Sequence, residues 1–153
     1  MKRAFTIVEL VIYMGLVISL FVVLGTLFAD TLHLQLESQS TSQVESDGRY
    51  LIARLAYDIH RASSLTTPAA PGQSGSSLTL VVAGQTYTYA LTGSQLLLTT
   101  PTGTFNLTDP NTVASNYTVT RLANSPGIPT TRITFNLTSG SESRSYTTTV
   151  GLR

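Results

Sequence analysis

An uncharged apolar run from Leu10 to Ala29 constrains this chain more than any other feature of its sequence. The run reads LVIYMGLVISLFVVLGTLFA, and its roughly 20 residues, at ~1.5 Å each, match a hydrocarbon layer of ~30 Å. We therefore predict a membrane-spanning helix. Lys2 and Arg3 precede the run, whereas Asp30 and Glu37 follow it. The positive-inside rule then places the N-terminus in the cytoplasm and the larger part of the chain outside.

The helical pattern continues beyond the apolar run, so we predict an amphipathic continuation over residues 30–64 that ends at about Ser63. An apolar stripe recurs at spacings of three, four and seven, at Val44, Leu51, Leu55, Ile59 and Ala62. The opposite face is predicted to be solvated and to carry three ion pairs, Glu45–Arg49, Arg54–Asp58 and Asp58–Arg61. Gly48 is poor in a helix interior, and it predicts a bend or frayed turn.

The remainder of the chain is predicted to be a Pro/Gly/Ser-rich linker at 65–77 and an antiparallel sheet domain at 78–153. LTLVVA and QTYTYAL, on either side of Gly84, predict a hairpin in which Tyr87, Tyr89 and Leu91 form the buried face. Further strands are expected at Leu96–Thr99, Tyr117–Leu122, Thr131–Leu137 and Ser143–Leu152, with loops at 101–116 and 123–130. The predicted fold is α+β, with a long N-terminal helix packed on a small antiparallel sheet.

The composition argues against several classes of protein. The chain has no Cys, so disulfides, thiolate nucleophiles and zinc-finger sites are excluded. Only 11% of its 153 residues are charged and the net charge is +1, which gives no sign of nucleic-acid binding. Stability must therefore come from packing.

Candidate catalytic and metal-binding residues do not form a recognisable site in the sequence. GQSGS, beginning at Gly72, lacks the closing Gly of a nucleophile elbow and lies in the predicted linker. His33 and His60 have no partners at ligand spacing. Asp109 with Asn111 is compatible with a calcium loop, but an Asx-turn explains DPN at least as well. We expect no enzymatic activity, no cofactor and no metal.

The N-terminal string KRA-FTIVEL resembles the class III signal of type IV prepilins and of type II secretion pseudopilins. That signal has a basic leader, a small residue, Phe, a carboxylate four residues later and then an apolar span. RYLIARLAYDIHRASS, followed by SLTLVV, QTYTYAL and QLLLTT, resembles the minor pilin W or pseudopilin J subgroup. The family most often has Gly where Ala4 stands in this sequence.

The resemblance implies a pilin-like fold and specific roles for three residues. Residues 1–4 would be a leader removed by a prepilin peptidase, which cleaves between Ala4 and Phe5 and methylates the new amino group of Phe5. Residues 5–29 would be the membrane and assembly segment, and Glu9 the assembly glutamate. The implied partners are the peptidase/N-methyltransferase, other pilins or pseudopilins, the inner-membrane assembly platform and membrane lipid. The implied location is the inner membrane and then a periplasmic or extracellular filament.

Glu9 also stands out on physical grounds, because a carboxylate beside a membrane span is costly unless a partner compensates it. Cleavage after Ala4 would create an amino group on Phe5, about 6 Å along the helix axis, able to neutralise Glu9 within one subunit or in the next. The resemblance implies the second arrangement. A glutamate that snorkels to the lipid headgroups is the simpler reading.

Other readings of the N-terminus stay open. A secretory signal peptide needs a shorter apolar run and an A-x-A site, whereas here Leu27 precedes Ala29. A plain signal anchor would give a tethered extracytoplasmic binding or adhesive domain that does not polymerise. A major pilin is a third possibility. Type IV pili, secretion pseudopili and competence systems, with roles in adhesion, motility, DNA uptake or protein secretion, are all compatible with the sequence.

Overall fold

The computed structural model describes residues 6–122 and 127–153, which form one long helix and nine strands. Helix α1 (Ile7–Arg61) is followed by all the strands, so the predicted α+β class is confirmed. By internal contacts the chain divides into residues 1–38 and residues 39–153, and we call the second unit the head. Helix α1 ends two residues before the predicted boundary at Ser63.

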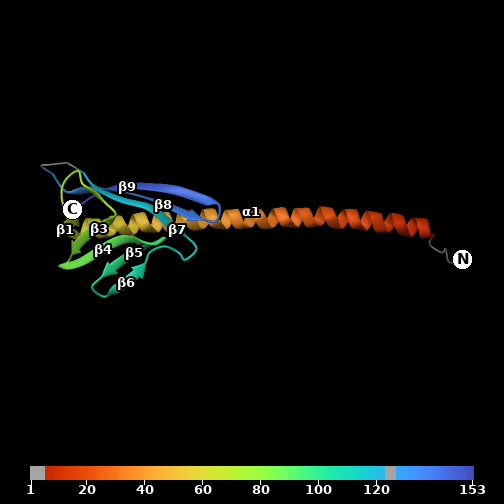
Figure 1. The fold of residues 1–153 in the computed structure, drawn as a ribbon, viewed down its shortest axis with the longest axis horizontal. Helices are drawn as coiled ribbons and strands as arrows, with labels where there is room; N and C mark the ends of the chain where they lie inside the picture. The colour runs from red at the N-terminus through yellow and green to blue at the C-terminus, as the bar shows by residue number, and fades with distance from the viewer. Residues whose placement is uncertain (1–5, 123–126) are drawn as a thin grey trace. The chain divides into compact units, whose positions relative to one another are not determined.

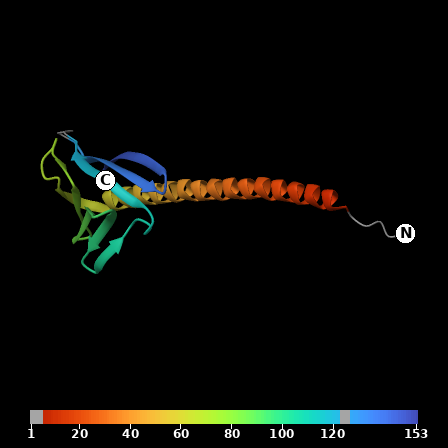
Figure 2. The same ribbon diagram turned by 45° about the vertical axis from the view of Figure 1, so that its right-hand side comes forward.

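The strands of the head form two antiparallel sheets, where the sequence predicted one. The first has the order β1-β3-β4-β5-β6 and the second the order β2-β7-β8-β9. Within the head, the two sheets lie on opposite sides of the C-terminal part of α1 (Figures 1 and 2). The strands are β1 (Ala62–Thr67), β2 (Ser74–Gly75), β3 (Ser77–Val82), β4 (Gln85–Thr92), β5 (Gln95–Thr100), β6 (Gly103–Asn106), β7 (Val113–Arg121), β8 (Thr130–Ser139) and β9 (Glu142–Gly151).

The core of the head forms where α1 meets both sheets. The predicted stripe is confirmed on the helix, because Val44, Leu51, Leu55 and Ile59 have no exposed surface. Ala62 is also buried, at 4% exposed, but it is the first residue of β1 and not part of the helix. Tyr89 of β4 and Phe135 of β8 are the largest of the fully buried side chains that meet it. One buried stripe of the helix thus contributes to a core that it shares with residues of both sheets.

The predicted hairpin is confirmed. Strands β3 and β4 pair antiparallel, and Ala83 and Gly84 connect them with φ of 51° and 77°. Two consecutive positive φ values give the primed turn that suits a two-residue hairpin. Tyr89 is buried, while Tyr87 and Leu91 pack partly buried against the core, as the alternation predicted.

The segment predicted as a linker at 65–77 contains strand structure instead. β1 begins directly after the helix and pairs with β3, with Leu65 opposite Leu80, and the short β2 pairs with β7. The Ser/Thr-rich sequence gives β1 no clear period of its own, so partner strands far away in the sequence decide its state. The predicted loop at 101–116 likewise contains β6 and the beginning of β7.

The predicted bend at Gly48 is wrong, since α1 is one unbroken helix there. Gly48 is buried, and a Cβ atom at this position would lie 2.2 Å from Cζ of Tyr146 on β9. The glycine therefore provides room for an aromatic ring against the helix backbone.

Candidate functional site

The first turn of α1 carries the residue that the sequence singled out. Thr6 precedes the helix, and its Oγ1 accepts a hydrogen bond from the backbone N–H of Glu9 at 3.3 Å. The Thr6 carbonyl accepts the first helical bond, from the N–H of Leu10 at 3.2 Å. Thr6 is thus the N-cap and Glu9 the N3 residue of a T-x-x-E capping sequence. The letters TIVE show this capping pattern directly in the sequence, but it was not among the predictions.

Glu9 is exposed, and it is the sole charged residue in the described stretch from residue 7 to residue 29. The positive end of the helix dipole lies in its first turn and favours a carboxylate there. Ala4 and Phe5, the predicted cleavage and methylation residues, lie outside the described residues. Of the three predicted site residues, the structure therefore describes only Glu9.

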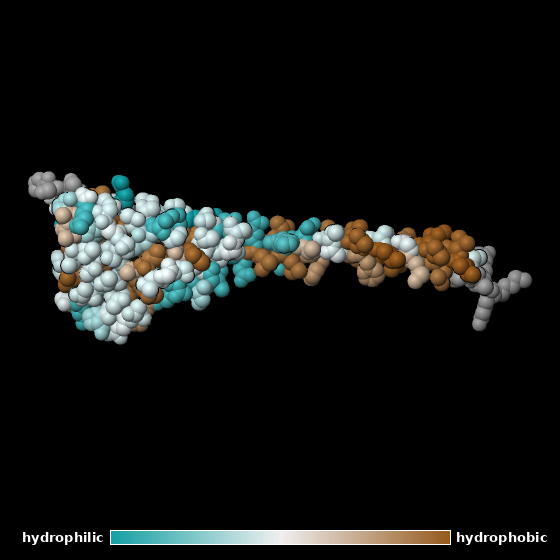
Figure 3. All heavy atoms as spheres, viewed as in Figure 1, coloured by the Kyte–Doolittle hydropathy of each residue, from teal (hydrophilic) through white to brown (hydrophobic). Residues whose placement is uncertain are grey.

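An apolar surface follows Glu9 along α1, and Figure 3 shows it as a concentration of hydrophobic side chains on this part of the helix. Large apolar residues from Ile7 to Leu36 are mostly more than half exposed. One shallow hollow on this surface is lined by Leu10, Tyr13, Met14, Val17 and Ile18. The helix is long and apolar enough to cross a membrane, which is compatible with a membrane anchor.

Three serine and threonine hydroxyls in and just after this apolar segment are satisfied by the helix itself. The side chains of Ser19, Thr26 and Thr31 donate to the carbonyls of Leu16, Val23 and Leu27, at 2.8–2.9 Å. In an apolar medium an unsatisfied hydroxyl is costly, and these bonds remove that penalty. In contrast, the carboxylate of Glu9 requires a compensating charge or contact with water.

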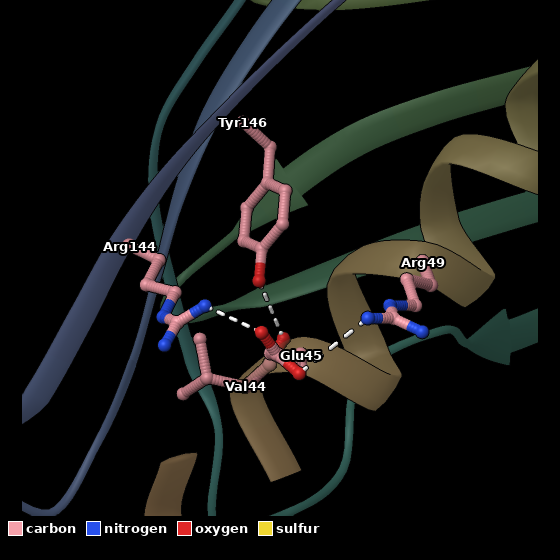
Figure 4. Close-up of polar contacts among 5 residues, drawn as sticks. All are labelled: Val44, Glu45, Arg49, Arg144 and Tyr146. Atoms are coloured by element: carbon pink, nitrogen blue, oxygen red, sulfur yellow. Dashed lines mark hydrogen bonds and ion pairs between the residues drawn. The ribbon is translucent and has the colours of Figure 1, made fainter. Parts of the chain in front are cut away.

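A second polar cluster attaches β9 to α1 within the head (Figure 4). Arg144 donates to Glu45 at 2.6 Å, and Arg49 pairs with the same carboxylate at 3.6 Å, as predicted for Glu45–Arg49. The Tyr146 hydroxyl donates to the Val44 carbonyl at 2.9 Å, and its ring stacks on Phe135 with centroids 5.4 Å apart. Burial raises the pKa of Tyr146. These contacts have a structural role, because they hold the edge strand against the helix.

A third polar cluster corrects the prediction that Asp58 lies on a solvated face. Asp58 is 1% exposed and accepts hydrogen bonds from Nε of Arg54, at 3.0 Å, and from the Tyr89 hydroxyl. Burial and the bond to Asp58 raise the pKa of Tyr89 well above its ordinary value. The predicted Arg54–Asp58 pair thus forms as a buried contact. The structure records no Asp58–Arg61 pair, and Arg61 instead donates to Tyr57 at 3.0 Å and covers its ring.

The other candidate residues do not assemble into a reactive centre in the described part of the chain. Asn111 donates its N–H to Oδ1 of Asp109 at 2.9 Å, so DPN forms the Asx-turn considered in the sequence analysis. His33 and His60 are exposed on α1, and Ser74–Gly75 of GQSGS forms β2. No group of three His, Cys, Asp or Glu residues suited to a metal occurs among residues 6–122 and 127–153.

A functional proposal has to rest on the arrangement of these residues, because known proteins supply no match. No protein-family model matches the sequence, and no curated protein or solved structure matches the chain.

Proposed function

We propose that this chain is the precursor of a minor pilin or pseudopilin, a structural subunit that initiates or caps a type IV pilus or a secretion-type pseudopilus. The observation that carries the proposal is the placement of Glu9. It is a lone exposed carboxylate in the first helical turn, at the start of an apolar surface where the hydroxyls of Ser19, Thr26 and Thr31 are already satisfied. Such a charge requires a partner, and the prepilin-like sequence before it offers one in the amine that cleavage would create.

In the proposed pathway, a prepilin peptidase cuts between Ala4 and Phe5 and methylates Phe5 in the inner membrane. The amine of an incoming subunit then pairs with Glu9 of a subunit already packed. Charge pairing sets the axial register, and the apolar segments of neighbouring subunits supply contact area. The partners are other pilins or pseudopilins, the assembly platform and membrane lipid, and the head faces the periplasm or the exterior.

Substitutions at Glu9 separate charge pairing from helix capping, the other role that its position supports. Glu9→Ala removes both the charge and the side chain that suits N3 of a capping box, whereas Glu9→Gln removes the charge alone. The bond from the backbone N–H of residue 9 to Thr6 is available in both variants. We expect both variants to reduce filament incorporation at least about tenfold, because a lost buried charge pair is worth more than ~1.4 kcal/mol. Incorporation is measured as the ratio of subunit in sheared filaments to subunit in membranes. Normal incorporation of Glu9→Gln would reject the pairing.

The mature N-terminus tests the processing step independently. Mass spectrometry of the chain purified from its membrane fraction is expected to find an N-methylated Phe5. A chain that begins at Met1 would favour an anchored extracytoplasmic binding domain that does not polymerise, whereas a chain cut near Ala29 would favour a secretory signal peptide. Either result would reject the proposed processing. Counts of subunits per filament distinguish a minor subunit from a major pilin.

A further inference from the structure

A groove in the head is open on the side of the first sheet that faces α1. It has a volume of about 470 Å³, within the ~300–1,000 Å³ typical of ligand sites. Helix α1 contributes Tyr50 and Arg54, β4 contributes Tyr87, and β6 contributes Phe105. Tyr50 and Phe105 are each 51% exposed, so about half of each side chain is open to solvent.

The groove carries little net charge. Arg54 is the one charged residue among the described residues that line it, and its guanidinium is already paired with the buried carboxylate of Asp58. A polyanion such as single-stranded nucleic acid is normally held in a groove with surplus positive charge. The charge balance here favours an uncharged ligand.

Several residues that line the groove carry neutral hydrogen-bonding groups. Four lining residues supply such groups: the side-chain amide of Gln85, the side-chain amide nitrogen of Asn106 and the hydroxyls of Tyr50 and Tyr87. None of these groups has a hydrogen-bond partner in the part of the chain that the structure describes. They are free to bind a ligand that donates and accepts hydrogen bonds around its rim.

We propose that this groove binds a neutral saccharide, as a short stretch of an oligosaccharide or polysaccharide chain. A pyranose ring has an apolar face of C–H groups that packs on an aromatic ring, and a rim of hydroxyls that bonds to amides and phenols. Aromatic rings, unpaired neutral donors and a compensated charge therefore match this ligand class. The site lies entirely in the head and does not depend on filament assembly.

The helix supplies a matched control for a test of this site. Tyr57 lies seven residues after Tyr50 on α1 and is 53% exposed, against 51% for Tyr50. Tyr57 does not line the groove, because its ring and hydroxyl contact Arg61. Tyr50→Ala and Tyr57→Ala thus remove the same side chain at equal exposure, one inside the groove and one outside it.

The experiment is saturation-transfer NMR on the full chain in a zwitterionic detergent that contains no sugar. The probes are maltotriose, cellotriose and triacetylchitotriose, with a phosphorylated hexose and oligothymidylate as charged probes. We expect at least one neutral trisaccharide to receive magnetisation on its ring C–H protons. Tyr50→Ala and Phe105→Ala are expected to weaken its binding at least about tenfold, whereas Tyr57→Ala leaves it unchanged.

Three outcomes would overturn the assignment. They are absence of binding by all three trisaccharides, an equal loss in Tyr57→Ala, and binding of oligothymidylate in place of the sugars. Circular dichroism of each variant checks that the head is folded, so that a lost signal reports on the groove. Failure of this test leaves the roles of Glu9 and Phe5 in assembly untouched, because those residues lie outside the head.

Discussion

Single residues decide how closely α1 and the second sheet approach, and Gly48 shows this most clearly. Tyr146 occupies the space above Gly48 and is held there by the stack on Phe135 and the bond to the Val44 carbonyl. A methyl group on residue 48 would have to displace that ring. The helix tolerates an unfavourable residue because the contact requires it.

Gly48→Ala is therefore expected to lower the free energy of unfolding by about 1–3 kcal/mol, the typical effect of overpacking. Urea denaturation followed by circular dichroism measures the change. In a Tyr146→Ala background the clash is absent, and the same substitution should stabilise the head by up to ~1 kcal/mol through helix propensity. If Gly48→Ala destabilises equally in both backgrounds, the proposed role of the ring contact is wrong.

The buried tyrosines predict how stability depends on pH. Unfolded tyrosine has an ordinary pKa of 10.0, and in the head burial and the bond to Asp58 raise the pKa of Tyr89. Burial also raises the pKa of Tyr117, whose hydroxyl has no partner among the described residues. The folded head holds these protons more tightly than the unfolded chain. Their stabilising contribution is complete below pH 10 and decreases as the pH rises above it.

We expect the free energy of unfolding to fall above pH ~10 by up to about 1.4 kcal/mol per pH unit for each such tyrosine. Urea titrations at pH ~8 to ~11 measure the slope. Tyr89→Phe and Tyr117→Phe should each make the slope shallower, because each removes a hydroxyl whose pKa burial raises. If Tyr89→Phe keeps the wild-type slope, the raised pKa of Tyr89 does not contribute to the loss of stability at high pH.

At the scale of elements, the apolar part of α1 and its C-terminal part follow different rules. Residues up to Leu36 have exposed apolar side chains on all sides, whereas the part from Val44 onward buries a stripe. A helix that is apolar all round requires an apolar medium or neighbouring copies. The self-bonded hydroxyls of Ser19, Thr26 and Thr31 fit that requirement.

The membrane reading of this segment predicts the effect of charge at its centre. Each arginine there raises the free energy of insertion by about 2.5–3.5 kcal/mol, so Leu20→Arg with Leu24→Arg should offset most of the apolar contribution. We expect the double variant to appear in the soluble fraction after alkaline extraction of membranes. Leu20→Ala with Leu24→Ala, which shortens the same side chains without charge, should remain in the pellet. Full retention of the arginine variant would argue against a membrane span.

At the scale of the whole molecule, the division into two units has a direct consequence. The buried apolar residues of the described chain begin at Val44 and end at Leu152, so the head contains its own core. A chain of residues 39–153 is expected to be monomeric and to unfold in one cooperative transition. A shorter chain of residues 50–153 lacks Val44, Glu45 and Gly48, and should be less stable by several kcal/mol. Analytical ultracentrifugation and urea denaturation compare the two.

A fragment 39–153 without a cooperative transition would show that the head needs the preceding helix. Equal stability of the two fragments would show that the contacts of β9 with Val44 and Glu45 contribute nothing measurable.

The sequence by itself determined the features that depend on local pattern. The helix stripe and the β3–β4 hairpin were correctly predicted, because period and turn chemistry are local properties. The apolar run lies on a helix that is long and apolar enough to cross a membrane. The candidate role of Glu9 also came from the sequence, through its charge and its neighbours. The T-x-x-E cap was equally visible in the sequence and was overlooked.

Only the tertiary structure decided which surfaces meet. Asp58 was assigned to a solvated face by its ion-pair spacing, but Tyr89, 31 residues away, buries it. Gly48 was assigned to a bend, but Tyr146 packs against it, and β1 became a strand by pairing with β3. The groove at Tyr50 and Phe105 likewise joins segments that are distant in the sequence. Long-range contacts of this kind leave no local pattern, since each residue's environment is set by partners that its neighbours do not specify.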